Sequence, residues 1–177
     1  DQTFVDPTNP NTSAHTTLGK LRTALNFDGV DDHIYPPNAD WKNAFASDWA
    51  MAFWVKQQDI ADGYTKYLIY NVEALPGGGY LGARIIFTSA GTMQGRFYLG
   101  ATYGYKDVGS VTAADDGQWR HVVMQRNGTT LEFWVNGVRI AYNTATGNNT
   151  SMACNYPYLK IGGSGTTGHC NCSIDDF

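Results

Sequence analysis

Most of the chain alternates apolar and polar residues with the period of two that is typical of β-strands. Residues 21–27 alternate in this way, and within residues 49–56 Phe53 lies on one side of the chain while Trp54 lies on the other. Successive side chains of a strand point to opposite faces, so each segment has a core face and an outer face. The same criteria predict further strands at residues 33–35, 67–71, 80–88, 95–101, 108–111, 118–126, 130–135, 138–142, 158–162 and 172–177.

Turn residues separate the predicted strands and indicate how they connect. Asn136 and Gly137 lie between two alternating segments, and Asn-Gly favours the type I′ turn of a β-hairpin because both positions need a positive φ. About a dozen short strands are too many for one flat sheet. The sequence therefore predicts an all-β fold, a two-sheet antiparallel jelly-roll sandwich, with Trp54, Trp119 and Trp134 filling its core.

The first twenty residues differ from the rest of the chain. Residues 1–20 are rich in Pro, Asn and Thr and show almost no periodicity, so we expect an extended N-terminal arm or linker. The jelly-roll domain is expected to comprise residues 21–177 and to be clipped at its C-terminal strand, because the sequence stops in mid-strand.

Composition and charge exclude several classes of protein. Hydrophobic residues make up 42% of the chain and charged residues 16%, which is the opposite of a disordered protein. The net charge is -4 and the Lys and Arg residues are scattered, so no nucleic acid partner is expected. No apolar stretch approaches the roughly 20 residues that span a bilayer, so no membrane insertion is expected. No signal peptide is visible at the N-terminus.

Six segments, in this order, carry a resemblance to a known family. They are residues 25–34 (LNFDGVDDHI), 52–56 (AFWVK), 116–123 (DGQWRHVV), 131–138 (LEFWVNGV), 159–163 (LKIGG) and 174–177 (IDDF). With these segments the sequence is similar to the concanavalin A-like lectin/glucanase group, and most closely resembles its laminin-G-like (LamG) jelly-roll domains. This resemblance implies a jelly roll, and it implies a carbohydrate-binding, adhesive, lectin-like, hydrolytic or viral surface role.

The sequence does not predict a catalytic residue. Glycoside hydrolysis needs two carboxylates on one cleft, and the two glutamates, Glu73 and Glu132, are 59 positions apart. The four histidines lie near no nucleophile elbow, and His121 is expected to be a packed sheet residue. The protein is therefore predicted not to be an enzyme, with a glycoside hydrolase as the most distant alternative.

Aspartates suggest a structural calcium site, since calcium prefers oxygen ligands. Asp28 and Asp31 lie in one turn with Asp32, and Asp175 and Asp176 lie in the last predicted strand. In the resembling folds the first and last strands are neighbours, so the two groups could meet. The predicted ligands are Asp28, Asp31, Asp175 and Asp176, and the alternative is that Asp28 and Asp31 only form the turn.

Tyrosines near predicted turns are candidates for ligand contact, because their rings are large, stiff and polar at the tip. The candidates are Tyr64, Tyr80, Tyr103 and Tyr105, although aromatic residues at a sandwich rim can also be purely structural. The predicted function is a non-catalytic binding module for glycan or a surface protein, located outside the cell or on a virion or cell surface. The alternative is a structural or decorating protein whose residues 1–20 dock on a neighbouring subunit.

Three cysteines leave the disulfide pairing open. Cys170 and Cys172 are two residues apart, a spacing that disfavours a bridge between them, so Cys154 is the expected partner of either. The alternative is three reduced thiols.

Overall fold

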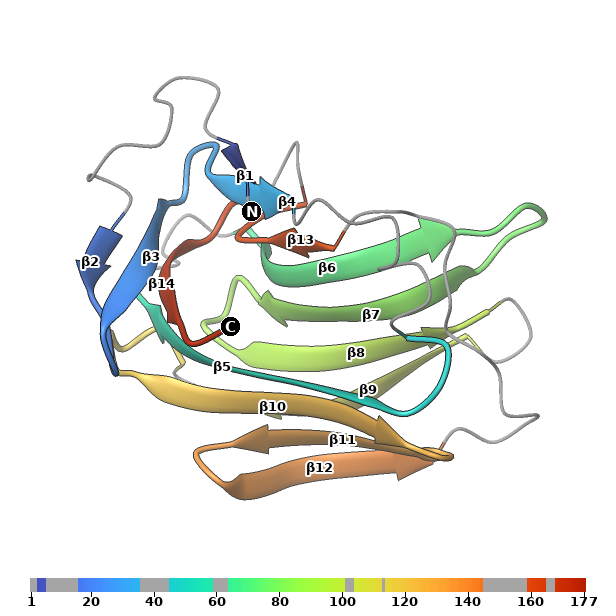
Figure 1. Ribbon diagram of the computed structural model, residues 1–177. Coiled ribbons are helices and arrows are strands. Elements are labelled where there is room, and N and C mark those ends of the chain that lie inside the picture. The colour runs from blue at the N-terminus through green and yellow to red at the C-terminus, as the bar shows by residue number, and fades with distance from the viewer. Residues whose placement is uncertain are drawn as a thin grey trace.

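Two antiparallel β-sheets pack face to face in the computed structural model of this chain (Figure 1). The structure describes residues 3–5, 16–35, 45–58, 64–100, 104–112, 114–144, 159–164 and 168–177. Across these ranges each sheet has seven strands, and no residue is helical. The described part of the chain accordingly holds no helix that could cross a membrane. The prediction of an all-β jelly-roll sandwich is confirmed.

Sheet 1 contains a meander of four strands that follow one another in sequence and pair as neighbours. Figure 1 shows this meander as the broad layer coloured green to yellow. From edge to edge, sheet 1 comprises β1 (Thr3–Val5), β4 (His33–Tyr35), β13 (Lys160–Ile161), β6 (Lys66–Ala74), β7 (Tyr80–Phe87), β8 (Met93–Leu99) and β9 (Tyr105–Val111).

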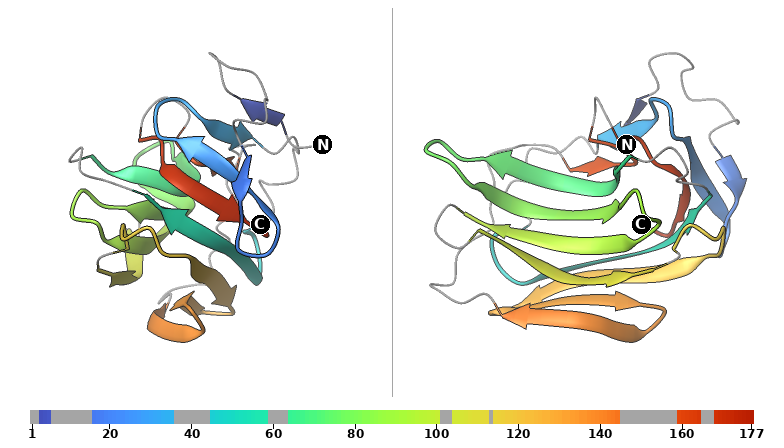
Figure 2. Two further views of the ribbon diagram at one scale, coloured as in Figure 1. Left: turned by 90° about the vertical axis from the view of Figure 1, so that its left-hand side faces the viewer. Right: turned by 180° about the vertical axis from the view of Figure 1, so that it is seen from behind.

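Sheet 2 joins the two ends of the chain, because its C-terminal strand lies between two strands from the N-terminal third. Both views in Figure 2 show this last strand, in red, set between its blue and teal neighbours. From edge to edge, sheet 2 comprises β12 (Val138–Thr144), β11 (Thr130–Val135), β10 (Arg120–Asn127), β5 (Trp49–Gln57), β14 (Asn171–Asp175), β3 (Thr23–Asp28) and β2 (Thr16–Leu18).

The predicted strands agree with the observed ones to within a few residues. β4 and β11 have the predicted bounds. The hairpin between β11 and β12 turns at Asn136 and Gly137, whose φ angles are 52° and 77°. Positive φ at both positions is the geometry of the type I′ turn that Asn-Gly favours.

The expected boundary of the folded domain at residue 21 is wrong. β1 pairs with β4 at the edge of sheet 1, and β2 pairs with β3 at the edge of sheet 2. Both strands lie in the Pro-, Asn- and Thr-rich segment that shows almost no periodicity, so the sequence pattern missed them. The described parts of residues 1–20 therefore complete the two sheets of their own chain.

Phenylalanines, not tryptophans, form the centre of the core. Trp54 and Trp134 are only partly buried, and each alternates with fully buried neighbours in its strand. They therefore face outward, and Trp119, just before β10, is also partly buried. The expectation that these three tryptophans fill the interior is wrong. The largest side chains with less than 2% exposure include Phe27, Phe53, Phe87, Phe97 and Phe133.

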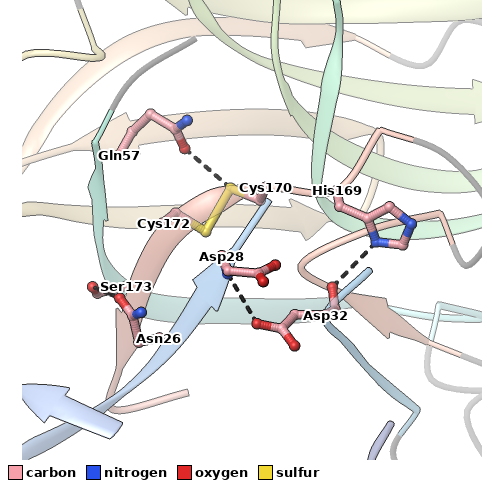
Figure 3. Close-up of a disulfide and its surroundings, with 8 residues drawn as sticks. All are labelled: Asn26, Asp28, Asp32, Gln57, His169, Cys170, Cys172 and Ser173. Atoms are coloured by element: carbon pink, nitrogen blue, oxygen red, sulfur yellow. Dashed lines mark hydrogen bonds between the residues drawn. A yellow bond between two sulfur atoms is a disulfide. The ribbon is translucent and has the colours of Figure 1, made fainter. Parts of the chain in front are cut away.

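The disulfide also differs from expectation, because Cys170 pairs with Cys172 (Figure 3). Their Cα atoms are 5.4 Å apart, less than the roughly 6.6 Å that two residues span in a regular strand. This contraction, at the start of β14, brings the pair into the range of disulfides. Cys154 lies outside the described residues. The bridge closes a ring much shorter than a 15-residue loop, for which the stabilisation is about 3 kcal/mol.

Candidate functional site

Three tyrosines form a row on the outer face of sheet 1. Tyr98 lies opposite Tyr105 in the pairing of β8 with β9, and their ring centroids are 6.2 Å apart. Tyr80, at the start of β7, has its ring centroid 5.6 Å from that of Tyr98. Tyr98 is 8% exposed, whereas Tyr80 and Tyr105 are 50% and 54% exposed. The row therefore has a fixed centre and two accessible ends.

Arg96 fixes one end of this row. Its guanidinium carbon lies 3.9 Å from the ring centroid of Tyr105, and its Nε and Nη2 donate to Asp107 at 2.5 and 3.0 Å. Burial lowers the pKa of Arg96, but hydrogen bonds to Asp107 and Tyr98 outweigh this effect and raise the pKa above its ordinary value. The charge of Arg96 is thus balanced by Asp107, and the pair orients the Tyr105 ring.

Arg84 supplies a second guanidinium beside the row. Its central carbon lies 5.4 Å from the ring centroid of Tyr98, and its Nε is buried without a hydrogen-bond partner among the described residues. Gly82 lies opposite Tyr98 in the register and has no side chain to cover it. We call Tyr80, Tyr98 and Tyr105, together with Arg84 and Arg96, the tyrosine face.

The structure brings two of the four predicted tyrosines together. Tyr80 and Tyr105 meet through Tyr98, which the sequence analysis did not select. Tyr64 is 71% exposed and lies elsewhere, and Tyr103 is outside the described residues. Arg96 and Tyr98 alternate within β8, so the period of two already placed them on one face. Only the register of the neighbouring strands shows that Gly82 and Tyr105 lie opposite Tyr98.

Tyr64 borders a second feature, the turn between β3 and β4. A hollow of about 450 Å³ there is lined by residues that include Gly29, Tyr64, Lys66 and His169. In the same turn, ligand oxygens of Asp28, Asp31 and Asp32 lie within 4.8 Å of one another. We call these three residues the aspartate turn.

Local hydrogen bonds shape the aspartate turn (Figure 3). Asp32 Oδ2 accepts the N–H of Asp28 at 2.9 Å, and Asp28 Oδ1 accepts the N–H of Val30 at 2.7 Å. Asp32 is buried and Asp28 is exposed. Carboxylates this close repel one another unless a cation or a proton intervenes.

The expected meeting of this turn with Asp175 and Asp176 is wrong. β14 runs antiparallel to β3, and the register places Asp28 opposite Asn171. Four residues of strand separate Asn171 from Asp175, a distance of about 13 Å. The strands are neighbours as expected, but their opposite directions separate the two acidic groups.

Asp175 has a different role at the other end of β14. Its Oδ2 accepts the N–H groups of Leu21 at 2.7 Å and Arg22 at 3.4 Å. The hydrogen bond from Leu21 is the main cause of a pKa below the ordinary value, and burial opposes it. Asp175 therefore joins the last strand to the segment between β2 and β3.

The two glutamates lie in different sheets, Glu73 on β6 and Glu132 on β11. Glu132 accepts hydrogen bonds from Gln125, from Arg139 at 3.0 Å and from Trp134 Nε1 at 3.4 Å. The bond from Gln125, followed by that from Arg139, lowers the pKa of Glu132. A carboxylate held ionised in this way is a poor general acid.

Fold and site together define a jelly-roll β-sandwich with outward-facing aromatic and acidic surface groups. The sequence matches the profile of the concanavalin A-like lectin/glucanases superfamily over residues 28–177. The chain belongs to that superfamily. A comparison with curated protein sequences gives no significant match.

Several solved structures share the fold at low sequence identity. The binding domain of botulinum neurotoxin serotype D has a TM-score of 0.70 and 12% identity, covering 100% of this chain and 41% of that one. Domains LG4-5 of the mouse laminin α1 chain have a TM-score of 0.53 and 17% identity, covering 76% of this chain and 39% of that one. This chain thus spans about two fifths of the neurotoxin and laminin chains.

A further similar structure was solved with a sugar. Domain 4 of AbnA, a GH43 extracellular arabinanase from Geobacillus stearothermophilus, was determined in complex with arabinotriose. It has a TM-score of 0.60 and 16% identity, covering 99% of this chain and 78% of that one. Identities this low establish the shared fold alone.

Proposed function

We propose that this chain is a non-catalytic module that binds glycan on the tyrosine face, outside the cell or on the surface of a cell or particle. The observation that carries the proposal is the row of three rings, in which Tyr80 and Tyr105 each contact Tyr98. A sugar ring has apolar C–H faces and hydroxyl groups at its edges, so it suits an aromatic row beside polar donors. Arg84 is such a donor.

The comparisons support a sugar ligand. The arabinanase domain with arabinotriose is similar along nearly the whole chain, which makes arabinotriose a suitable first probe. Tyrosine-rich faces also bind proteins, so a surface protein is the other partner class, and a failure of every saccharide to bind would favour it.

The test is calorimetric titration of the full chain with neutral oligosaccharides, beginning with arabinotriose and including glucan, galactan and chitin fragments. We expect at least one to bind, and we expect Tyr105→Ala to weaken that binding about tenfold, which is the upper range of an aromatic contact. Tyr64→Ala is the control, because Tyr64 is exposed but lies away from the tyrosine face.

Two outcomes would overturn the proposal. The first is no binding of any saccharide at millimolar concentration. The second is binding that Tyr64→Ala weakens and Tyr105→Ala does not.

The positions of the two glutamates are the basis for proposing that the protein is not a glycoside hydrolase. Glu73 and Glu132 lie in opposite sheets and cannot act across one glycosidic bond, for which the carboxyl groups lie about 5 to 9.5 Å apart. Incubation with β-glucans, galactans and chitin should release no reducing ends above a heat-treated control. Turnover that is lost on changing either glutamate would contradict the proposal.

We also propose that the aspartate turn binds calcium as a structural ion. Three carboxylates within 4.8 Å offer the oxygen ligands that calcium prefers, and a cation would relieve their mutual repulsion. Because Asp175 and Asp176 lie at the other end of β14, the proposed ligands are Asp28, Asp31 and Asp32. The alternative is that these residues only shape the turn. The measurement of Tm with and without calcium, given in the Discussion, distinguishes the two.

A further inference from the structure

A hollow of about 490 Å³ lies on the outer face of sheet 2, on the opposite side of the sandwich from the tyrosine face. β5 and β10, side by side in Figure 1, supply its floor. Its lining residues are Lys20, Trp54, Trp119, His121 and Asn136. We call it the tryptophan hollow, and none of its residues belongs to the sites described above.

Aromatic and cationic side chains alternate across this surface. His121 lies opposite Trp54 in the register, with ring centroids 5.1 Å apart. Lys56, two residues beyond Trp54 on the same face of β5, has its Nζ 5.5 Å from the ring centroid of Trp119. Lys56 therefore lies near both tryptophans, and both indole rings line the hollow. Each indole ring can contact a different sugar ring of one ligand.

The two lysines at the hollow form no ion pair with a carboxylate of the described residues. Lys20 Nζ lies 5.2 Å from the ring centroid of Trp54, and neither Lys20 nor Lys56 forms an ion pair within the described ranges. None of the described residues that line the hollow is a carboxylate. Asp175 lies opposite Trp54 in the register, and its carboxylate, which accepts the N–H of Leu21 and has a lowered pKa, adds one negative charge beside the hollow. Lys20 and Lys56 against Asp175 leave one positive charge in excess at this surface, in a chain of net charge -4.

A second cation and tryptophan pair on the same sheet provides an internal contrast. The guanidinium of Arg139 lies 5.9 Å from the ring centroid of Trp134, and Arg139 donates to Glu132 at 3.0 Å. That pair carries its own counter-ion, whereas neither Lys20 nor Lys56 has a carboxylate within ion-pair distance among the described residues.

We propose that the tryptophan hollow binds a saccharide bearing carboxylate or sulfate groups. The two indole rings supply apolar faces for sugar rings, and Lys20 and Lys56 supply charge for the acidic substituents. Asn136 Oδ1 accepts the N–H of His121 at 2.9 Å, which leaves its NH₂ group to donate to a hydroxyl. This site goes beyond the neutral glycan proposed for the tyrosine face and is independent of it.

The experiment titrates the full chain with three probes and follows tryptophan fluorescence and heat. The probes are an oligogalacturonate hexamer, its methyl ester and a heparin hexasaccharide, so carboxylate, neutral and sulfate forms are compared. We expect one or both anionic probes to bind and the ester to fail. Binding should weaken strongly between about 0.01 and 0.5 M salt, since exposed charges are screened.

Matched variants locate the site. Lys20→Gln and Lys56→Gln should each weaken binding about two- to fivefold, as expected for exposed charge pairs, and the double variant should weaken it further. Trp119→Ala should weaken binding and reduce the fluorescence response, of which the part that comes from Trp54 remains. Arg139→Gln removes a cation from the same sheet outside the hollow and should leave the affinity unchanged, as should Tyr105→Ala on the opposite face.

Four results would overturn the proposal. Neither anionic probe binds, the methyl ester binds equally well, Arg139→Gln weakens binding as much as Lys56→Gln, or a hexaglutamate peptide binds as tightly as the saccharides. The last result would identify the hollow as a site for acidic peptide. Because Tyr105→Ala reports only on the tyrosine face, failure here is distinguishable from failure of the proposed function.

Discussion

At the scale of single residues, the face of a strand decides what a side chain does. Trp54 and Phe53 are adjacent in β5, yet Phe53 is buried in the core and Trp54 lines a surface hollow. Glu132 is 9% exposed although it lies on an outer face, because Gln125 and Arg139 from the two neighbouring strands surround it. Large aromatic and charged residues at outward positions thus build surface features rather than core.

Asp175→Asn should destabilise the fold at neutral pH by about 1 kcal/mol, the difference between charged and neutral acceptors of the Leu21 N–H bond. The folded pKa of Asp175 is lowered, so its stabilisation is complete above the unfolded pKa near 3.9 and is lost as pH falls through the folded pKa. Urea unfolding at several pH values should show a flatter acid limb for the variant.

The control is Asp176→Asn. Asp176 is exposed and has a φ of 55°, a conformation that Asn tolerates well, so the change should cost less than about 0.5 kcal/mol. If Asp175→Asn and Asp176→Asn behave alike, the bonds from Leu21 and Arg22 contribute no net stability.

At the scale of elements, backbone contacts between strands limit which residues the sheets accept. Gly82 has a φ of 117°, and a Cβ there would lie 1.9 Å from the carbonyl oxygen of Asn71 on β6. Glycine is the residue that permits both this conformation and this approach. The position opposite Tyr98 therefore has no side chain because of the way β6 and β7 pair.

Gly82→Ala should lower stability by about 3 kcal/mol or more, because β6 or β7 must move. Gly78→Ala is the matched control: its φ is 103°, but nothing lies within 4 Å of the added Cβ, so only conformational strain of about 1 kcal/mol remains. Thermal unfolding of both variants measures the difference. Equal losses would contradict the predicted clash.

Truncation at the N-terminus tests the corrected domain boundary. Removing residues 1–15 deletes β1, whereas removing residues 1–22 also deletes β2 and the N–H donors to Asp175. The longer deletion should lower Tm by roughly 5–10 °C more than the shorter one does. This estimate uses a Tm change of about 2–4 °C for each kcal/mol of lost stability in a chain of this size. Equal Tm values would restore the boundary at residue 21 that the sequence suggested.

At the scale of the whole molecule, the proposed sites lie on two different outer faces of the sandwich and at the aspartate turn. The tyrosine face lies on sheet 1, the tryptophan hollow on sheet 2, and the aspartate turn joins β3 of sheet 2 to β4 of sheet 1. Because both sheets and the turn depend on one core, ligand binding at any of these sites should stabilise the entire fold.

Calcium at a hundredfold excess over its Kd should add about 2.7 kcal/mol of stability, and magnesium should add less because it rarely accepts an all-protein cage. Scanning calorimetry with calcium and with chelator measures the shift in Tm. Asp31→Asn should abolish most of it, whereas Asp176→Asn should not, because Asp176 follows β14 and lies five positions beyond Asn171, the residue opposite Asp28. Identical Tm values with calcium and chelator would show that the aspartates only form the turn.

The sequence by itself determined the fold class and the strand order along the chain. Alternation with a period of two and turn residues such as Asn136 and Gly137 are local properties, so they could be identified without the structure. The same alternation placed Lys56 beside Trp54 on one face of β5. Residues Thr3–Val5 and Thr16–Leu18 could not be predicted, because they lie in a Pro-, Asn- and Thr-rich segment with almost no periodicity and are strands only through their pairing with β4 and β3.

Only the tertiary structure decided which residues meet. The register of β8 against β9 brings Tyr98 to Tyr105, and the antiparallel direction of β14 carries Asp175 away from Asp28. A shift of one residue in register would exchange the two faces of a strand, and no local pattern specifies that choice between strands distant in sequence. The sites therefore follow from the packing of the two sheets, whereas the strands that carry them follow from the sequence.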